Sequence, residues 1–221
     1  MVVEKNLTVA KIKRENERLA ETLERTLLEL QFKNGQLEES LQRVEQLAAT
    51  DPLTGLYNRR HFGKVLEQLF AEAQRYDTDL ACVMIDLDGY KQLNDTHGHQ
   101  VGDQLLVSAG KVITANLRRM DVAARYGGDE FVILLPHADT PEAAGVAQRI
   151  RDDYFKASAG VLRAEQGVRM SIGIGSLRTN RPTGADQLVA LADKALYRAK
   201  EAGRNRIAVS EPVEAPVPTA A

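Results

Sequence analysis

The 221-residue sequence has one cysteine, no tryptophan and only 5% aromatic residues, and none of its apolar runs is long enough to span a membrane. The single cysteine, Cys82, excludes an intrachain disulfide and is typical of a protein in a reducing compartment. Because Cys82 stands inside the apolar segment 80–85, the sequence predicts a packed core residue rather than a nucleophile. The N-terminus has no apolar segment of the kind that secretion signals carry, so we expect a cytoplasmic protein without a membrane segment.

The sequence also lacks an excess of charge of either sign. Its 29 Lys and Arg residues stand against 31 Asp and Glu residues, which gives a net charge of -2. Proteins that bind a nucleic acid polymer usually carry a basic surface, so the composition does not support that function. Hydrophobic residues make up 43% and charged residues 27% of the chain, a normal balance for a soluble domain.

Residues 1–48 contain no proline and one glycine, and apolar residues recur among charged ones at helical spacing. Steps of three and four connect Val9, Ile12, Asn16, Leu19, Leu23, Leu27, Leu30, Asn34, Leu37, Leu41 and Val44. This spacing predicts a long helix that forms a homodimer through a coiled coil. Two successive steps of four within residues 19–27 are a stutter, which locally unwinds a left-handed supercoil. Asn16 and Asn34 fall on core positions that favour a two-stranded state. The alternative is an amphipathic helix packed on its own domain, although the apolar stripe is narrow for that.

Residues 49–209 predict one α/β domain in which the order of elements is βαββαβ. The expected strands are 80–86, 122–126, 131–135, 168–176 and a short 205–209; the expected helices are 59–74, 141–157, 184–202 and one that follows Gly102 and ends near Asn116. This order predicts a ferredoxin-like palm, an α+β fold in which helices cover one face of an antiparallel-containing sheet. Residues 210–221 are rich in proline and alanine and predict a disordered tail.

Acidic residues stand where the first strand and the hairpin turn end. Asp86 ends the apolar strand, and Asp88 follows at i+2 and points to the same side. Asp129 and Glu130 follow the glycine pair 127–128 in the turn. If the hairpin lies beside the first strand, these carboxylates converge, and converging carboxylates repel unless a cation lies between them. Oxygen ligands favour Mg²⁺. Taken alone, however, the pattern is explained better by an ordinary hairpin with solvated acids.

Further polar residues fit a purine nucleotide at the same place. Lys91, Asn94 and Asp103 follow the first acidic strand end. A carboxylate can accept both N–H donors of a guanine edge, and an Asn amide can serve its acceptor side. Lys200 and Arg204 lie on either side of the predicted end of the last long helix and suit phosphate oxygens. The helix macrodipole is the alternative reason for cations there.

Segment 125–136, RYGGDEFVILLP, resembles the signature of the diguanylate cyclase family, with Gly-Gly-Asp-Glu-Phe at 127–131. Four other blocks are similar to that family in the same order: DPLTGLYNRRHF (51–62), MIDLDGYKQLNDTHGHQVGDQLL (84–106), SIGIG (171–175) and ADKALYRAKEAGRNRI (192–207). The resemblance thus spans 51–207. It departs mildly at Gly89, where a larger residue is frequent, and at Tyr90, where Phe is usual.

The resemblance implies an enzyme that condenses two GTP molecules into cyclic di-GMP and releases two pyrophosphates, with Mg²⁺ or alternatively Mn²⁺. Asp86, Asp129 and Glu130, the catalytic residues by resemblance, would hold the metal together with the backbone carbonyl of Leu87. Glu130 would also help to deprotonate the attacking 3′-hydroxyl. The GTP-binding residues would be Asn94 and Asp103 for guanine, Lys200 and Arg204 with Lys91 for the phosphates, and Gly127 and Gly128, which admit the nucleotide. Since one domain holds one GTP, two half-sites must face each other, and the coiled coil would raise their effective concentration.

Arg118 and Asp121 form an R-x-x-D string shortly before the hairpin turn. It resembles the family's product-inhibition site, where cyclic di-GMP binds, and Arg149 of a neighbouring subunit would contribute. The alternative is an ordinary surface Arg–Asp pair. A second reading of the whole chain is a catalytically silent receptor for cyclic di-GMP or GTP, but such receptors lose acidic residues that this sequence keeps. No sensor domain is recognisable, so we expect an upstream sensor or partner protein to supply the signal.

Overall fold

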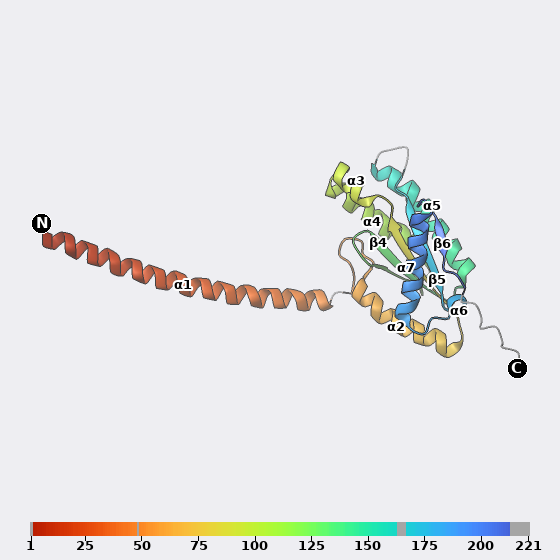
Figure 1. The fold of residues 1–221 in the computed structure, drawn as a ribbon, viewed down its shortest axis with the longest axis horizontal. Coiled ribbons are helices and arrows are strands. Elements are labelled where there is room, and N and C mark those ends of the chain that lie inside the picture. The colour runs from red at the N-terminus through yellow and green to blue at the C-terminus, as the bar shows by residue number, and fades with distance from the viewer. Residues whose placement is uncertain (1, 48, 163–166, 213–221) are drawn as a thin grey trace. The chain divides into compact units, whose positions relative to one another are not determined.

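A computed structural model of the chain describes residues 2–47, 49–162 and 167–212, which form two compact units, Met1–Ala48 and Ala49–Ala221. The first unit is one helix, α1 (Val2–Leu47) (Figure 1). The second is an α/β domain. In the part of the chain that the structure describes, no helix combines the length and the apolar character needed to cross a bilayer.

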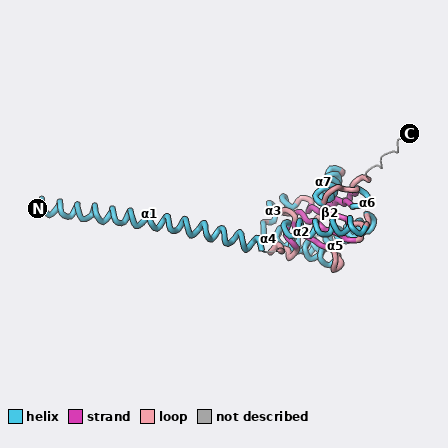
Figure 2. The backbone as a smooth tube through the Cα atoms, turned by 90° about the horizontal axis from the view of Figure 1, so that it is seen from below, coloured by secondary structure: helices cyan, strands magenta, loops and turns pink. Residues whose placement is uncertain are grey.

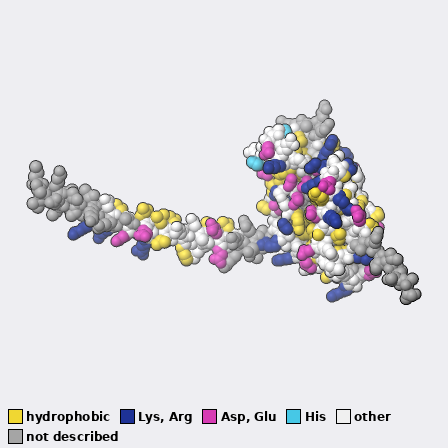
Figure 3. Space-filling model, viewed as in Figure 1, with side chains coloured by type: hydrophobic (Ala, Val, Ile, Leu, Met, Phe, Trp, Pro, Cys, Tyr) yellow, Lys and Arg dark blue, Asp and Glu magenta, His cyan; other side chains and the backbone are white. Residues whose placement is uncertain are grey.

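The predicted long helix is confirmed, and its apolar stripe lies open. The seven described apolar positions of the stripe are each more than half exposed: Leu19, Leu23, Leu27, Leu30, Leu37, Leu41 and Val44. Figure 3 shows such hydrophobic side chains along the helix among charged ones. Val9 and Ile12, also assigned to the stripe, lie outside the residues whose side chains are described. Exposed leucines at this spacing favour burial against a second helix, because a lone helix leaves them in water.

The described part of the second unit contains a six-stranded sheet. Its spatial order is β1 (Tyr57–Asn58), β3 (Val122–Arg125), β4 (Glu130–Pro136), β2 (Leu80–Leu87), β5 (Met170–Ser176) and β6 (Ile207–Val209). β2 is antiparallel to both β4 and β5, and β3 is antiparallel to β4. These four strands form the predicted βαββαβ palm, while β1 and β6 extend it at the two edges by parallel pairing.

Six helices connect and cover the described strands. They are α2 (Arg59–Tyr76), α3 (Tyr90–His97), α4 (His99–Ala115), α5 (Thr140–Leu162), α6 (Leu177–Asn180) and α7 (Ala185–Glu201). Helix α3 was not predicted, because Gly89 and Gly98 on either side of it interrupt the helical pattern; both have positive φ, 75° and 83°. β1 and α6 were not predicted either, since two and four residues are too few to show a period.

Helices cover both faces of the sheet, so the prediction that they lie on one face is wrong (Figure 2). Ala81, Val83 and Ile85 of β2 belong to the core cluster that includes α4 and α5. The alternate residues, among them Cys82, belong to the cluster that includes α2 and α7. The physical reason is the uninterrupted apolar run of β2, which needs cover on each side. Burial raises the pKa of Cys82 to about 12, so its predicted role as a core residue is confirmed.

The ordered domain continues past the predicted boundary at residue 209. The N–H of Ser210 donates to the carbonyl of Ile174 at 2.7 Å, and its hydroxyl donates to Asn180 Oδ1 at 2.5 Å. Asn180 Nδ2 in turn donates to the carbonyl of Glu211 at 2.7 Å. Ser210 and Glu211, assigned to the tail from their composition, are therefore bound to the domain. Residues 213–221 of the predicted tail lie outside the described residues.

Candidate active site

The carboxyl end of β2 lies beside the hairpin turn, which meets the condition on which the acidic residues were expected to converge. The sheet register places Asp86 opposite Glu130, and the N–H of Leu87 donates to the carbonyl of Asp129 at 3.3 Å. Burial raises the pKa of Asp86; Lys200 works against this rise, and the negative charges of Asp129 and Asp88 add to it. The structure therefore gathers negative charge at a partly buried point, an arrangement that a bound cation would stabilise.

The ammonium group of Lys200 supplies a positive charge next to Asp86. Its ammonium nitrogen lies 2.7 Å from Oδ2 of Asp86, and both side chains are largely shielded, at 29% and 13% exposure. The sequence assigned Lys200 to phosphate binding, whereas the structure places it on the candidate metal ligand. A charge-assisted contact at this distance shows that the carboxylate of Asp86 accepts a cation in this position.

The donor atoms at this point suit Mg²⁺. Asp86, Asp129 and Glu130 offer carboxylate oxygens, and Leu87 offers a backbone carbonyl, which are the hard ligands that Mg²⁺ prefers. Among residues 2–47, 49–162 and 167–212, no three His, Cys, Asp or Glu side chains lie close enough to hold a metal ion by themselves. Magnesium usually completes its coordination with water and substrate phosphates. The residues present therefore fit a divalent metal whose coordination is completed by ligands from outside the protein.

The glycine turn is held tightly against the acidic residues. The N–H groups of Tyr126 and Gly127 both donate to the carbonyl of Glu130, at 2.8 and 3.3 Å. A Cβ added at Gly127 would lie 2.6 Å from Oε2 of Glu130, so only glycine leaves room for that carboxylate in its present position. The carbonyl of Gly128 accepts hydrogen bonds from Arg125 Nη2 at 2.7 Å and Nε at 3.1 Å.

Arg125 connects this turn to the start of the domain, a contact that sequence reasoning did not assign. Its Nη1 lies 3.3 Å from Oδ2 of Asp51, and Oδ1 of Asp51 accepts from the N–H and hydroxyl of Thr54 at 2.8 and 2.7 Å. Burial alone would raise the pKa of Asp51, but the Thr54 hydrogen bonds and the Arg125 charge outweigh it and lower that pKa. The only sequence signal was that Asp51 and Arg125 both stand in the family-like blocks.

The candidate guanine residues lie on α3 and α4. Oδ1 of Asn94 is buried and has no hydrogen-bond partner among the described residues. A buried acceptor without a partner is costly, so a ligand that donates to it would be stabilised. Asp103 and Lys91 are exposed, and both can reach solvent or a ligand. The backbone of Gly102 approaches Asn94 so closely that a Cβ there would lie 1.7 Å from Oδ1.

By the guanine role that the resemblance implies for Asn94, replacement of Gly102 by Ala is expected to weaken GTP binding by about tenfold, because the new methyl group must displace the Asn94 amide. The KM for GTP of the purified protein measures this effect. Gly63→Ala is the matched control, since Gly63 is a helical glycine of α2 with nothing within 4 Å of its added Cβ. An unchanged KM in Gly102→Ala would show that Asn94 does not bind the base from this position.

Two of the three residues predicted for product inhibition lie together. Asp121 Oδ2 accepts the N–H of Arg118 at 2.7 Å, and the Asp121 N–H donates back to the Arg118 carbonyl at 3.0 Å. Both line a cavity of about 390 Å³ that Thr50 and Tyr57 also line. Arg149 lies exposed on α5 and is not among the described residues that line this cavity.

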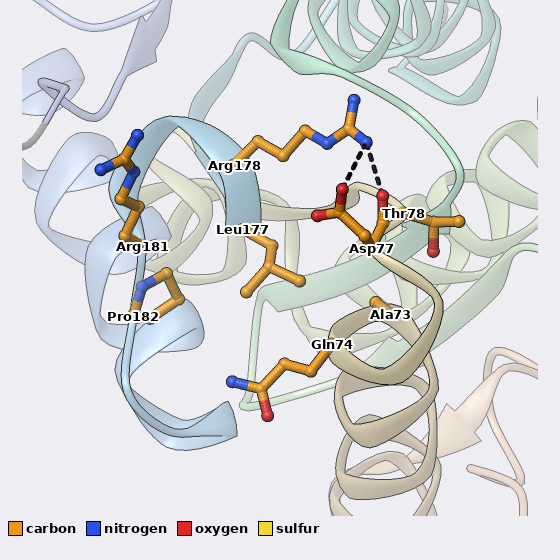
Figure 4. A pocket seen from close by; sticks show the side chains of 8 residues that line it. All are labelled: Ala73, Gln74, Asp77, Thr78, Leu177, Arg178, Arg181 and Pro182. Atoms are coloured by element: carbon orange, nitrogen blue, oxygen red, sulfur yellow. Dashed lines mark hydrogen bonds and ion pairs between the residues drawn. The ribbon is translucent and has the colours of Figure 1, made fainter.

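A second cavity, of about 710 Å³, lies before the start of β2, at the end of that strand opposite to Asp86 (Figure 4). Its walls come from the segment before β2 and the segment after β5. Arg178 reaches across to Asp77, where Nη2 lies 2.5 Å from the carbonyl and 3.9 Å from Oδ2. None of the predicted site residues lines it. The candidate active site is therefore the acidic end of β2, despite the greater volume here.

Comparison with known proteins gives this site a family context. The family model described as "Diguanylate cyclase, GGDEF domain" matches residues 48–206. Diguanylate cyclase DosC of Escherichia coli (strain K12) is 38% identical over 157 residues, which are 71% of this chain and 34% of that relative. The chain thus spans roughly a third of the length of this curated relative.

Two solved structures are similar over most of this chain. The coiled coil and GGDEF domain of DgcB from Caulobacter crescentus, in complex with c-di-GMP, matches with a TM-score of 0.67 and 30% identity, covering 85% of this chain and 98% of that one. Diguanylate cyclase SiaD from Pseudomonas aeruginosa, in complex with its activator SiaC, matches with a TM-score of 0.68 and 32% identity, covering 95% of this chain and 78% of that one. Each of the two matches covers more of this chain than the α/β unit contains, so both matches include part of α1.

Proposed function

Because the chain belongs to the GGDEF family of diguanylate cyclase domains, we propose that it condenses two GTP molecules into cyclic di-GMP with release of two pyrophosphates. The observation that carries this proposal is the acidic cluster at the end of β2. Asp86 and Glu130 lie opposite each other in the sheet, next to an intact glycine turn and within reach of Lys200. A degenerate receptor would not need to keep this cluster.

The metal site of the proposed reaction consists of Asp86, Asp129, Glu130 and the carbonyl of Leu87. When bound there, Mg²⁺ supplies neutralisation of phosphate charge. Glu130 accepts the proton of the attacking 3′-hydroxyl, for which its position beside Gly127 leaves the carboxylate free of a neighbouring Cβ. Mn²⁺ uses the same kind of oxygen ligands and is expected to substitute.

The nucleotide is held by residues on three helices and the loop after α7. Asn94 and Asp103 bind the guanine edge, and the orphaned Oδ1 of Asn94 supports this assignment. Lys200 and Arg204 bind the β- and γ-phosphates, with Lys91 of α3 in support. For Lys200 this requires a move, because its ammonium group contacts Asp86 in the structure.

The reaction requires a homodimer, because each domain binds one GTP. The 3′-hydroxyl of each GTP attacks the α-phosphorus of the GTP bound to the other domain. The exposed leucine stripe of α1 supports a parallel coiled coil that tethers two half-sites and raises their effective concentration. The DgcB structure, which includes a coiled coil as well as a GGDEF domain, is consistent with this arrangement. SiaD was solved with an activator protein, and we propose that this chain also takes its signal from a partner or an upstream sensor.

The proposed activity is tested by incubating the purified full chain with Mg²⁺ and GTP, or ATP as the control nucleotide, and separating the products by chromatography. We expect cyclic di-GMP and pyrophosphate from GTP and no cyclic product from ATP. A folded dimer that binds cyclic di-GMP tightly but makes no product, even at high protein concentration, would contradict the proposal and favour the receptor function.

Product inhibition is proposed to act through Arg118 and Asp121. Arg118→Ala is expected to raise the concentration of cyclic di-GMP that halves the activity by about tenfold or more, since a hydrogen bond to a charged group is lost. Arg149→Ala is expected to have a smaller effect, because Arg149 is not among the described residues that line the cavity of Arg118 and Asp121. Arg75→Ala, an exposed arginine at the end of α2, serves as the matched control. Inhibition that stays unchanged in Arg118→Ala would contradict the assignment.

A further inference from the structure

Asp88 stands two residues after Asp86 but makes entirely different contacts. Its Oδ1 accepts a hydrogen bond from the Ser171 hydroxyl at 2.7 Å, and its Oδ2 accepts one from the backbone N–H of Asn205 at 3.0 Å. Ser171 is fully buried in β5. Both oxygens of Asp88 are thus engaged by protein donors, and the carboxylate joins the end of β2 to β5 and to the loop that follows α7.

The backbone of that loop, residues 203–206, is strained. Arg204 has a φ of 61°, which is disfavoured for an arginine, and Asn205 follows with a φ of 48°, in the left-handed region that asparagine tolerates better. Such a conformation persists where neighbouring contacts hold it. The hydrogen bond from the Asn205 N–H to Asp88 is one of these contacts, and the pairing of the next residue with β5 is another.

The loop backbone determines the position and direction from which the Arg204 side chain extends. The N–H of Arg204 donates to the carbonyl of Ala199 at 3.0 Å, and the next N–H along the chain is the one bound by Asp88. Both peptide groups that flank Arg204 are therefore fixed, while its side chain is exposed. One turn earlier, Lys200 is bound directly by Asp86.

We propose that Asp88 is a positioning residue for triphosphate binding, which holds the loop after α7 so that Arg204 reaches the terminal phosphates of GTP. The inference rests on the proposed function of the site. It assigns different requirements to the two acidic residues at the end of β2. Asp86 needs its negative charge, whereas Asp88 needs hydrogen-bonding atoms in the right places. An Asn at position 88 would satisfy that need, because its amide oxygen can accept from Asn205 and its NH₂ group can donate to the Ser171 hydroxyl.

Direct binding of an inert nucleotide tests the proposal. The probe is the α,β-methylene analogue of GTP, compared with GMP, on the full chain in the presence of Mg²⁺. Asp88→Ala is expected to weaken analogue binding by about tenfold and to leave GMP binding unchanged, since GMP lacks the phosphates that Arg204 would contact. Asp88→Asn is expected to stay within about twofold of the wild type. Equal losses for the analogue and GMP, or an Asn variant as weak as the Ala variant, would overturn the proposal.

A double-mutant cycle separates positioning from a general loss of structure. If Asp88 acts through Arg204, Asp88→Ala adds little once Arg204 is already Ala, whereas multiplicative losses would overturn the proposal. Should Asp88→Ala fail to fold, Ser171→Ala takes its place, with a loss of about two- to threefold that again vanishes beside Arg204→Ala. A folded wild-type chain that binds neither the analogue nor GMP would instead overturn the proposed function, and this inference with it.

Discussion

Asp86→Asn is expected to lower the rate of cyclic di-GMP synthesis by about 10³-fold, the loss that follows removal of one preorganised electrostatic group from a transition state. Asp86 is the residue on which the site converges: it lies opposite Glu130, contacts Lys200 and feels the charge of Asp129. The neutral amide keeps the shape of the side chain but cannot offset the charge of a divalent cation. The initial rate of product formation from GTP and Mg²⁺ measures the effect.

The same substitution should not destabilise the fold. Burial raises the pKa of Asp86 above that of the unfolded chain. A carboxyl with a raised pKa makes its full contribution to folded-state stability below its unfolded pKa, and this contribution is lost as the pH rises through the folded pKa. At neutral pH the ionised group therefore costs stability, and since Lys200 is the more exposed partner and its long side chain can extend to solvent, we expect Asp86→Asn to match or exceed the Tm of the wild type.

Asp77→Asn is the control for both measurements, since Asp77 is fully exposed at the opposite end of β2 and its φ of 50° suits Asn. It should change neither rate nor Tm. If Asp86→Asn retained a rate within tenfold of the wild type, the carboxylate of Asp86 would not be part of the metal site. If its Tm fell steeply, the loss of activity would report unfolding instead.

Lys200→Met is expected to weaken the binding of GTP and to strengthen the binding of Mn²⁺. In the structure Lys200 neutralises Asp86, and in the proposed reaction it contacts phosphate. Its removal should raise the KM for GTP by about 10- to 100-fold, the cost of one charge-assisted hydrogen bond. Binding of Mn²⁺ alone should instead become tighter, on the order of tenfold, because no ammonium group competes for the carboxylate of Asp86.

The two effects are separable by experiment. Titration with Mn²⁺ in the absence of nucleotide measures cation binding, and steady-state kinetics gives KM. The Tm should fall without a divalent cation and recover when one is added, because the partly buried Asp86 would otherwise be left without a counter-ion. Lys194→Met, an exposed lysine on the same helix, is the matched control. Weaker Mn²⁺ binding in Lys200→Met would show that the two cations do not compete.

The parts of the fold that the sequence could predict are those with a strong local pattern. The apolar run before Asp86 and the glycine pair in the hairpin predict β2, β3 and β4 almost to the residue. The prediction that helices cover one face of the sheet was wrong, because a continuous apolar strand does not show by itself how many of its sides are covered. Helix α3 was not predicted, because the glycines on either side of it indicated a loop.

Contacts within the site could be predicted only as far as they are local. The acidic turn follows from hairpin geometry, whereas its placement beside Asp86 depends on the pairing of β2 with β4. The pairing of Lys200 with Asp86 and the bond from Asn205 to Asp88, which joins residues 117 positions apart, depend on how α7 crosses the sheet. Sequence periodicity carries no information on such crossings. The family resemblance supplied the residue types, and the tertiary structure supplies their partners.

The distance along the chain between these partners has a consequence for biosynthesis. When a ribosome has completed the catalytic turn, it has yet to make β5, which pairs with one edge of β2, and α7, which covers one of its faces. Until then the nascent domain exposes an unpaired strand edge and apolar surface, the features that promote aggregation. Lys200, near the end of α7, and the loop that Asp88 holds are made last. A growing chain is thus most exposed to aggregation in the interval between the synthesis of the glycine turn and that of α7.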